Sequence, residues 1–505
     1  MDKVQTAKRN IFWGLLNKFT LVIAPFMMRT AVVYSIGSNY LGLDSLYTSI
    51  LQMLNIAELG FSSALVFSMY KPLADNDIEE VCALLNLYKT VYRIVGLVVL
   101  CLGMIVIPFL PSLIKSDTPK DINIYYLYMF FLINTVLGYW LYAYKKSLLS
   151  ACRREDVVSK ITSLITIIKT ILQFFVLFIL RNYYAFVGVM IVATVIENIL
   201  ANYCSNHLFK EFCPKGKTGS ERIKDIIQRI KGLFIQRICA TSRNSMDSII
   251  ISTYLGLNIV AMYGNYYYIL FAIHGIMGTI INSILAIVGN SVAKDSPSKN
   301  YKDMLTFNFM YMWIASFCTV CMMCMYQPFI TLWMGKGMLL PEKTMILLCV
   351  YFYSLCMGDV RSMYYNAAGL WWEGRYRSIV EAATNIVLNI VLGKFFGLNG
   401  VVIATLISII VINFGYGSTI IHKYYFKGIS SITFYKEHIS YAFSTIVAAL
   451  ICYKLCMLFS LEGIPSLITN FLTCFFVSNC LFFIVYFRKE ECKNSIAIVR
   501  RLIVK

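Results

Sequence analysis

The chain has 505 residues, of which 59% are hydrophobic and only 14% charged, and its formal net charge is +19. A soluble domain is roughly 45–50% apolar and about 25% charged, so this composition excludes a soluble enzyme, a disordered chain and a collagen-like fibre. In a soluble protein the positive charge would indicate nucleic acid. In a chain this apolar it indicates basic loops on the inner side of a membrane, and we expect no nucleic-acid partner.

Long apolar runs predict an all-α polytopic membrane protein of about 14 transmembrane helices, because one crossing needs about 20 apolar residues. The first run follows Lys3, Lys8 and Arg9 and is too long for the core of a signal peptide. The predicted spans begin near Ile11, Leu43, Val91, Ile124, Ile161, Phe186, Phe234, Ile259, Phe307, Met345, Ser378, Val401, Tyr441 and Leu467.

Lysine and arginine collect in alternate connections, and this bias predicts that both termini lie in the cytoplasm. The longest connection, about residues 207–233, carries isoleucines at helical spacing with basic residues between them. It fits either a basic amphipathic helix on the inner membrane surface or a solvated linker helix.

The sequence contains an internal repeat. Tyr40-Leu41-Gly42-Leu43-Asp44 matches Tyr254-Leu255-Gly256-Leu257-Asn258, 214 positions later, and residues 188–194 resemble residues 400–405, one residue shorter, with starts 212 positions apart. We place the first pair of motifs between spans one and two and between spans seven and eight. The repeat predicts two parallel six-helix lobes around a cavity, as in alternating-access transporters. The predicted parts are an N-lobe (1–207), an amphipathic linker (208–233), a C-lobe (234–424), two extra spans (425–487) and a basic cytoplasmic tail (488–505).

Charged residues inside the predicted spans are candidates for function, because a charge at the bilayer centre costs roughly 2.5–3.5 kcal/mol on insertion scales. They are Lys18, Arg29, Glu58, Lys169, Glu197, Arg237, Arg243, Asp247, Asp359, Arg361, Glu381 and Lys454. Arg29 and Arg243 are also 214 positions apart, which predicts equal depth in the leading helix of each lobe. Asp247 follows Arg243 by one helical turn and could pair with it.

Arginine binds phosphate oxygens bidentately. We therefore predict a substrate-binding set of Lys18, Arg29, Arg237, Arg243 and Arg361. Charge partners or ion-coupling groups would be Glu58, Asp247, Asp359 and Glu381. The alternative is that each charge belongs to a structural ion pair between helices.

Two other patterns are assigned to structure. Cys318, Cys321 and Cys324 share one apolar helix, where cysteine behaves as a small hydrophobe, so we expect no metal site. Asp75-Asn76-Asp77 precedes Ile78-Glu79-Glu80 and fits the start of a helix better than a sugar-transferase motif.

Several motifs resemble the Wzx-type polysaccharide flippases of the multidrug/oligosaccharidyl-lipid/polysaccharide (MOP) exporter superfamily. They include Ala57-Glu58-Leu59-Gly60-Phe61, Tyr70-Lys71-Pro72-Leu73-Ala74, Tyr263-Gly264-Asn265-Tyr266, Ala367-Ala368-Gly369-Leu370-Trp371 and Phe396-Gly397-Leu398-Asn399-Gly400. The resemblance covers nearly the whole chain and implies a 14-helix protein of the bacterial cytoplasmic membrane. It implies transfer of undecaprenyl-diphosphate-linked oligosaccharide to the outer leaflet for capsule, O-antigen or a similar polymer. An Na⁺ or H⁺ gradient would drive the transfer without a cofactor, and partners would be the bilayer, a polysaccharide polymerase and chain-length machinery.

Two other classes stay open. One is a MATE-like exporter of small cationic drugs, which would favour an acidic and aromatic cavity. The other is a membrane-embedded polymerase or transferase, which usually needs a long outer loop or a group of catalytic carboxylates. We expect a transporter and not an enzyme.

Overall fold

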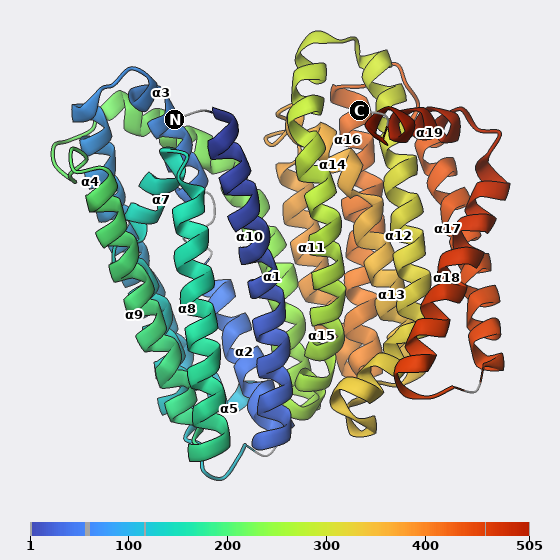
Figure 1. The fold of residues 1–505 in the computed structure, drawn as a ribbon, viewed down its shortest axis with the longest axis horizontal. Coiled ribbons are helices and arrows are strands. Elements are labelled where there is room, and N and C mark those ends of the chain that lie inside the picture. The colour runs from blue at the N-terminus through green and yellow to red at the C-terminus, as the bar shows by residue number, and fades with distance from the viewer. Residues whose placement is uncertain (1–2, 56–60, 116–117, 460, 504–505) are drawn as a thin grey trace. The chain divides into compact units, whose positions relative to one another are not determined.

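The computed structural model describes residues 3–55, 61–115, 118–459 and 461–503, and within these ranges the chain is helical without a β-strand. The helices form two compact units, Met1–Ala261 and Met262–Lys505, and each unit is described by itself (Figure 1). The predicted all-α class is confirmed.

The first unit is a bundle in which α8 packs between α1 and α9, while α6 packs between α4 and α9 (Figure 1). Large apolar side chains such as Phe19 and Phe178 remain exposed on the outside of the bundle, as expected for a surface that faces lipid. The helices are α1 (Lys3–Ser35), α2 (Ser38–Leu54), α3 (Phe61–Ala74), α4 (Ile78–Val106), α5 (Leu110–Leu113), α6 (Ile124–Trp140), α7 (Ala143–Ala151), α8 (Glu155–Phe175), α9 (Tyr183–Leu208) and α10 (Ser220–Leu255).

The second unit is built around α12, which packs against α13, α17, α18 and α19. Its helices are α11 (Leu257–Lys294), α12 (Pro297–Met334), α13 (Glu342–Met357), α14 (Asp359–Ala367), α15 (Arg375–Ile407), α16 (Gly417–Tyr424), α17 (Ser431–Leu458), α18 (Gly463–Tyr486) and α19 (Glu490–Ile503). A π-helical segment, η5 (Ser408–Tyr416), joins α15 to α16. The first turn of α11 belongs to the first unit.

Ten helices in the described ranges are long and apolar enough to cross a membrane, or eleven if α6 and α7, bent by 47°, form one span. The predicted count of about 14 is therefore not established. One of the ten is Arg375–Tyr424, whose 50 residues of helix would extend about 75 Å, far more than the roughly 30 Å of a hydrocarbon core. Gly397, with φ 58° and ψ −137°, breaks this segment between the predicted spans that begin near Ser378 and Val401.

The start of α4 agrees with the sequence analysis. Asp77 caps the helix by accepting a 3.0 Å hydrogen bond from the backbone N–H of Glu80. Glu79 and Glu80 lie in the first turn, where their charges face the positive end of the helix dipole. The acidic motif is therefore explained by helix capping.

The predicted linker 208–233 is not a separate helix. Helix α10 begins at Ser220 and continues through the predicted start of span seven to Leu255, a length of 36 residues. No proline interrupts this stretch, and one glycine, Gly232, does not break it. Its position at the inner membrane surface stays a prediction, as do the ranges of the two lobes. In the compact division, α10 belongs to the first unit through contacts with α2, α3 and α5.

The two copies of the repeated motif occupy different positions. We placed both copies between helices, but Tyr40–Asp44 lies inside α2, whereas Gly256 forms the turn between α10 and α11. The turn before α2 is instead at Gly37, and both turn glycines have positive φ, 111° and 92°. The start of α2 therefore does not coincide with the motif as the start of α11 does, so packing with other helices and not the local sequence sets this boundary.

This shift corrects the predicted equal depth of Arg29 and Arg243. Arg29 lies six residues before the end of α1, and Arg243 lies twelve residues before the end of α10. Since each helical residue rises 1.5 Å, their distances from the helix ends differ by about 9 Å.

The two motif copies also touch each other. A methyl group added at Gly42 would lie 2.3 Å from the carbonyl oxygen of Leu257, the first residue of α11. No real side chain tolerates that approach to a backbone atom, so glycine at position 42 permits the packing of α2 on this turn.

We expect Gly42→Ala to lower the free energy of unfolding by about 1–3 kcal/mol, because the backbone of Leu257 must move. Gly188→Ala, in α9, is the matched control: its methyl group would meet nothing within 4 Å, and alanine is favoured over glycine in a helix by about 1 kcal/mol. Thermal unfolding of the detergent-solubilised protein measures both. Equal midpoints for Gly42→Ala and the wild type would contradict the packing argument.

Candidate functional site: buried charge networks

The first unit contains charges of alternating sign on neighbouring helices. Arg29 is half-buried on α1, and Asp44 on α2 lies within electrostatic range of it. Asp44 also interacts with Lys169 on α8, and Lys169 in turn interacts with Glu197 on α9. The sequence analysis had singled out Arg29, Lys169 and Glu197 separately, and Asp44 links the first two.

The network ends at α7. Nζ of Lys146 forms a 2.8 Å ion pair with Oε1 of Glu197, and the same oxygen accepts a 2.9 Å hydrogen bond from Oγ1 of Thr162. Three cations and two carboxylates on α1, α2, α7, α8 and α9 therefore leave one positive charge in excess when all are ionised. We call Arg29, Asp44, Lys169, Glu197 and Lys146 the five-charge network.

A sharp change of direction places the lysines of α7. Tyr142 has φ 57°, and α7 departs from α6 at 47°. Lys145 is consequently buried, and its Nζ donates to Oδ1 of Asn206 at 2.7 Å and to the carbonyl of Phe212 at 3.3 Å. Lys146, one residue further, turns toward Glu197.

A polar pocket of about 460 Å³ adjoins the network, because Lys146 lines it. Oγ1 of Thr194 donates to Oδ1 of Asn134 at 2.8 Å, and Nδ2 of Asn198 donates to the carbonyl of Thr194 at 2.8 Å. Oδ1 of Asn198 is buried without a hydrogen-bond partner among the described residues. The other polar lining residues are Asn55, Tyr92, Thr135, Tyr139, Ser147 and Ser150. Hydroxyl and amide groups of this kind suit a hydroxyl-rich ligand beside a cation.

The second unit buries a different network. Arg361 on α14 is 1% exposed, and its Nη2 donates to Oδ1 of Asn413 at 3.0 Å and to Oγ of Ser362 at 3.1 Å. Nδ2 of Asn413 donates to both carboxylate oxygens of Glu381, at 3.0 and 2.9 Å. Asn413 therefore bridges the arginine and the carboxylate that the sequence analysis had predicted separately.

A second guanidinium group lies within electrostatic range of this bridge. Arg377 is buried, donates from Nη2 to Oγ of Ser378 at 3.2 Å, and faces the ring of Tyr365 at 5.8 Å. The Nε atoms of Arg361 and Arg377 have no hydrogen-bond partner within the described ranges. Gly417 makes room for Arg361, since a methyl group there would lie 1.9 Å from Nη1. Arg361 thus lies within electrostatic range of two carboxylates, Glu381 and Asp359, and of one other cation, Arg377.

Asp359, at the start of α14, forms its own contacts. Its Oδ2 accepts a 2.5 Å hydrogen bond from the hydroxyl of Tyr311 and lies 3.1 Å from Nε2 of His274. Cys356 is close enough that its sulfur, a His274 nitrogen and an Asp359 oxygen lie within 4.8 Å of one another, so these three could hold a metal ion. Asp359 and His274 are each about one quarter exposed, so a small cation or a proton can reach them.

The other predicted residues are placed less centrally. Lys18 on α1 and Arg237 on α10 are exposed, while Arg243 is half-buried and Asp247 is buried on α10. Glu58 lies outside the described residues. The structure thus joins Arg361 with Glu381 and gives Arg29 the partner Asp44.

Three members of these networks were missed. Asp44 was quoted only as the end of a motif that we assigned to a loop, and its place inside α2 was the missing signal. Asn413 carries no charge, so a search for charges in apolar runs could not find it. Arg377 lies just before a predicted span that begins near Ser378, where a basic residue is ordinary.

We expect Glu381→Gln to destabilise the second unit by about 3–5 kcal/mol, because it removes the carboxylate that Asn413 holds beside the buried Arg361. Glu381→Gln combined with Arg377→Met should recover part of the loss. The midpoint of thermal unfolding measures both changes, with Glu462→Gln at an exposed position as the control. The network has no electrostatic role if Glu381→Gln unfolds at the wild-type temperature.

Comparisons with known proteins give a family and two similar folds. The family described as polysaccharide biosynthesis protein matches residues 7–285, more than half of the chain. No curated protein matches the sequence. The fold is similar to that of the lipid II flippase MurJ in an inward closed conformation, at 14% identity and a TM-score of 0.66, over 96% of this chain and 99% of that one.

It is also similar to an inward-facing multidrug resistance MATE family transporter of the MOP superfamily, at 13% identity and a TM-score of 0.61, over 80% of this chain and 96% of that one. At these identities the likeness is one of fold. Both structures are of membrane transport proteins and not of enzymes, as predicted for this chain.

Proposed function

Because this chain belongs to the polysaccharide biosynthesis protein family, we propose that it is a Wzx-type flippase that carries an undecaprenyl-diphosphate-linked oligosaccharide to the outer leaflet. It would act in the bacterial cytoplasmic membrane, with both termini in the cytoplasm. The observation that carries the proposal is the five-charge network, with its surplus positive charge, beside the polar pocket of the first unit.

The network fits the diphosphate. A guanidinium left alone in a membrane protein is costly, and Asp44 balances Arg29 while no substrate is bound. A diphosphate presents more negative charge and more acceptor oxygens than one carboxylate, so it can replace Asp44 as the partner of Arg29. The surplus positive charge then disfavours the empty state and favours an anion.

The pocket fits the sugars. Its amide and hydroxyl groups can exchange hydrogen bonds with sugar hydroxyls. A volume of about 460 Å³ lies within the usual range for small-ligand pockets, so it holds part of a repeat unit. The polyprenyl tail needs no pocket, because it can stay in lipid.

The second unit supports a coupling role. Asp359 and His274 form a partly exposed pair of titratable groups, and Asp359 follows a break between α13 and α14 at Gly358. Ionisable residues inside a membrane span commonly mark ion or proton pathways. We assign Asp359 to coupling by H⁺ or Na⁺, and Arg361 with Glu381 to a buried network that keeps this break in place.

A MATE-like drug exporter is the second candidate, favoured by the fold likeness to a MATE family transporter. The charges argue against it. A site for cationic drugs needs a net negative charge, whereas cations outnumber carboxylates in the five-charge network.

The experiment separates binding from structural pairing at Arg29. The variants are expressed in a strain that lacks its own flippase and makes the native repeat unit. Arg29→Gln should reduce surface polysaccharide by about 10-fold or more, because one charge-assisted contact with the diphosphate is lost. Lipid-linked repeat unit should then accumulate on the inner side of the membrane. The neutral pair Arg29→Gln/Asp44→Asn should fold as stably as the wild type and still trap the intermediate.

Lys215→Ala, at an exposed loop position, is the control, and membrane expression is measured for every variant. Normal export by the neutral pair would show that Arg29 and Asp44 form only a structural ion pair. A wild-type chain that leaves the repeat unit inside but lowers sensitivity to cationic drugs would support the MATE-like candidate instead.

A further inference from the structure

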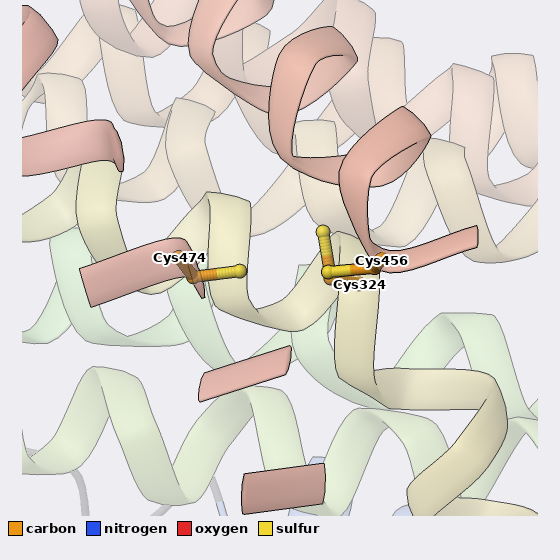
Figure 2. A group of neighbouring side chains, drawn as sticks. All are labelled: Cys324, Cys456 and Cys474. Atoms are coloured by element: carbon orange, nitrogen blue, oxygen red, sulfur yellow. The ribbon is translucent and has the colours of Figure 1, made fainter. Parts of the chain in front are cut away.

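Five cysteines from three helices form one cluster in the second unit. They are Cys321 and Cys324 on α12, Cys452 and Cys456 on α17, and Cys474 on α18. The sulfur atoms of Cys324, Cys456 and Cys474 lie within 4.8 Å of one another, and Figure 2 shows these three side chains meeting between their helices. Cys321 and Cys452 belong to the same packed cluster and lie within interaction range of the Cys474 thiol.

This cluster could not be predicted from the sequence. Cys321 and Cys324 lie on one apolar helix with Cys318, and three cysteines on one helix cannot close around an ion. Helices α17 and α18 supply the missing ligands from more than 120 positions further along the chain. Cys452 and Cys456 are one turn apart, so both point to the same side of α17.

We propose that this cluster binds one thiophilic d¹⁰ metal ion, Zn²⁺ or Cu⁺, with Cys324, Cys456 and Cys474 as ligands. Soft thiolates select these two ions over Mg²⁺, Ca²⁺ and Mn²⁺. Zn²⁺ would take Cys452 as a fourth ligand, whereas Cu⁺ is satisfied by three. A zinc–sulfur bond of about 2.3 Å places tetrahedral sulfurs about 3.8 Å apart, so the three sulfurs need to approach by about 1 Å or less.

Binding converts thiols to thiolates. Each cysteine that becomes a thiolate ligand releases one proton to solvent, and no electron is transferred. The ligand form of cysteine is the thiolate, so Zn²⁺ with four cysteines releases four protons and Cu⁺ with three releases three, and each loaded site carries a net charge of −2. The apolar residues that pack around the cluster include Val320, Ala448 and Ala449.

The surroundings provide support and access. Asn470 is buried on α18 and donates from Nδ2 to the carbonyl of Cys324 at 3.4 Å, which fixes the backbone of one ligand. Cys456 is half-buried, so the cluster is not sealed. Tyr453 lies within electrostatic range of Cys324 and donates a hydrogen bond to Glu342. These two polar side chains lie on the path by which an ion would enter and protons would leave.

The consequence is a crosslink between helices. Helices α17 and α18 correspond to the two predicted spans outside the repeat, and the metal would fasten both to α12. This role is independent of the proposed flippase activity, so the test uses metal binding and stability as its readouts.

The test begins with the full-length reduced protein in nanodiscs, stripped of metal by a chelator. Zn²⁺ and Cu⁺ are each titrated against a competing chelator, and metal per chain is measured by inductively coupled plasma mass spectrometry. We expect one tight equivalent of one of the two ions and a rise in unfolding temperature. Co²⁺ in the same site should give a thiolate charge-transfer band and tetrahedral d–d bands.

Matched variants identify the ligands. Cys324→Ala, Cys456→Ala and Cys474→Ala should each bind the ion about 100-fold or more weakly, since each removes one of three or four ligands. Cys349→Ala, a buried cysteine of α13, and Cys101→Ala, an exposed cysteine of α4, should bind it as the wild type does. The comparison with Cys349→Ala controls for loss of a buried thiol.

A measurement on the wild type covers variants that do not fold. The ion should slow alkylation of Cys456 and Cys474 by N-ethylmaleimide without affecting Cys101, as read by peptide mass spectrometry. Absence of stoichiometric binding, or equal alkylation with and without metal, would overturn the proposal. So would a disulfide between two cluster cysteines in the protein as isolated, because the ligands would then be consumed.

Discussion

The high cost of an uncompensated charge in a membrane shapes both units. Removing one partner from a buried ion pair costs several kcal/mol, so the buried charges of the two networks are held beside an opposite charge or a fixed dipole. In the first unit the signs alternate from Arg29 to Lys146. In the second unit, the side-chain amide of Asn413 lies between the two charges: its oxygen accepts a hydrogen bond from Arg361, and its nitrogen donates one to Glu381.

Interruptions of helical geometry bring these groups into position. Tyr142, which has a left-handed backbone conformation, changes the chain direction before α7 and its lysines. Helix α14 begins at Asp359, directly after Gly358. Gly417 has no side chain, which leaves room for the guanidinium of Arg361. A regular helix presents a side chain only to its own face, so polar groups from several helices converge best where a helix bends or begins. Lys145, Lys146, Asp359 and Arg361 therefore lie beside irregular points of the fold.

The fold class followed from composition and apolar runs, because a chain in lipid must satisfy its backbone within helices. Most predicted spans correspond to a helix, whereas their boundaries depended on packing: α10 runs through the predicted linker, and the turn before α2 is at Gly37. Arg29, Arg361 and Glu381 were found from sequence because ionised residues are rare in apolar runs. Their partners Asp44 and Asn413, and the joining of Cys324 with Cys456 and Cys474, were not found, because such contacts depend on which helices become neighbours.

The displaced motif affects how the two halves of this chain can be compared. The turn glycines Gly37 and Gly256 are 219 positions apart, whereas the motif copies are 214 apart, so two alignments of the same helices differ by five residues. Five residues turn an α-helix by about 140°, which exchanges much of one face for another. A chimera that swaps α1 for α10 on the motif register would therefore present a different helix face to the neighbouring helices. For the predicted repeat, the glycine turns and not the motif give the register in which an exchanged helix keeps its facing.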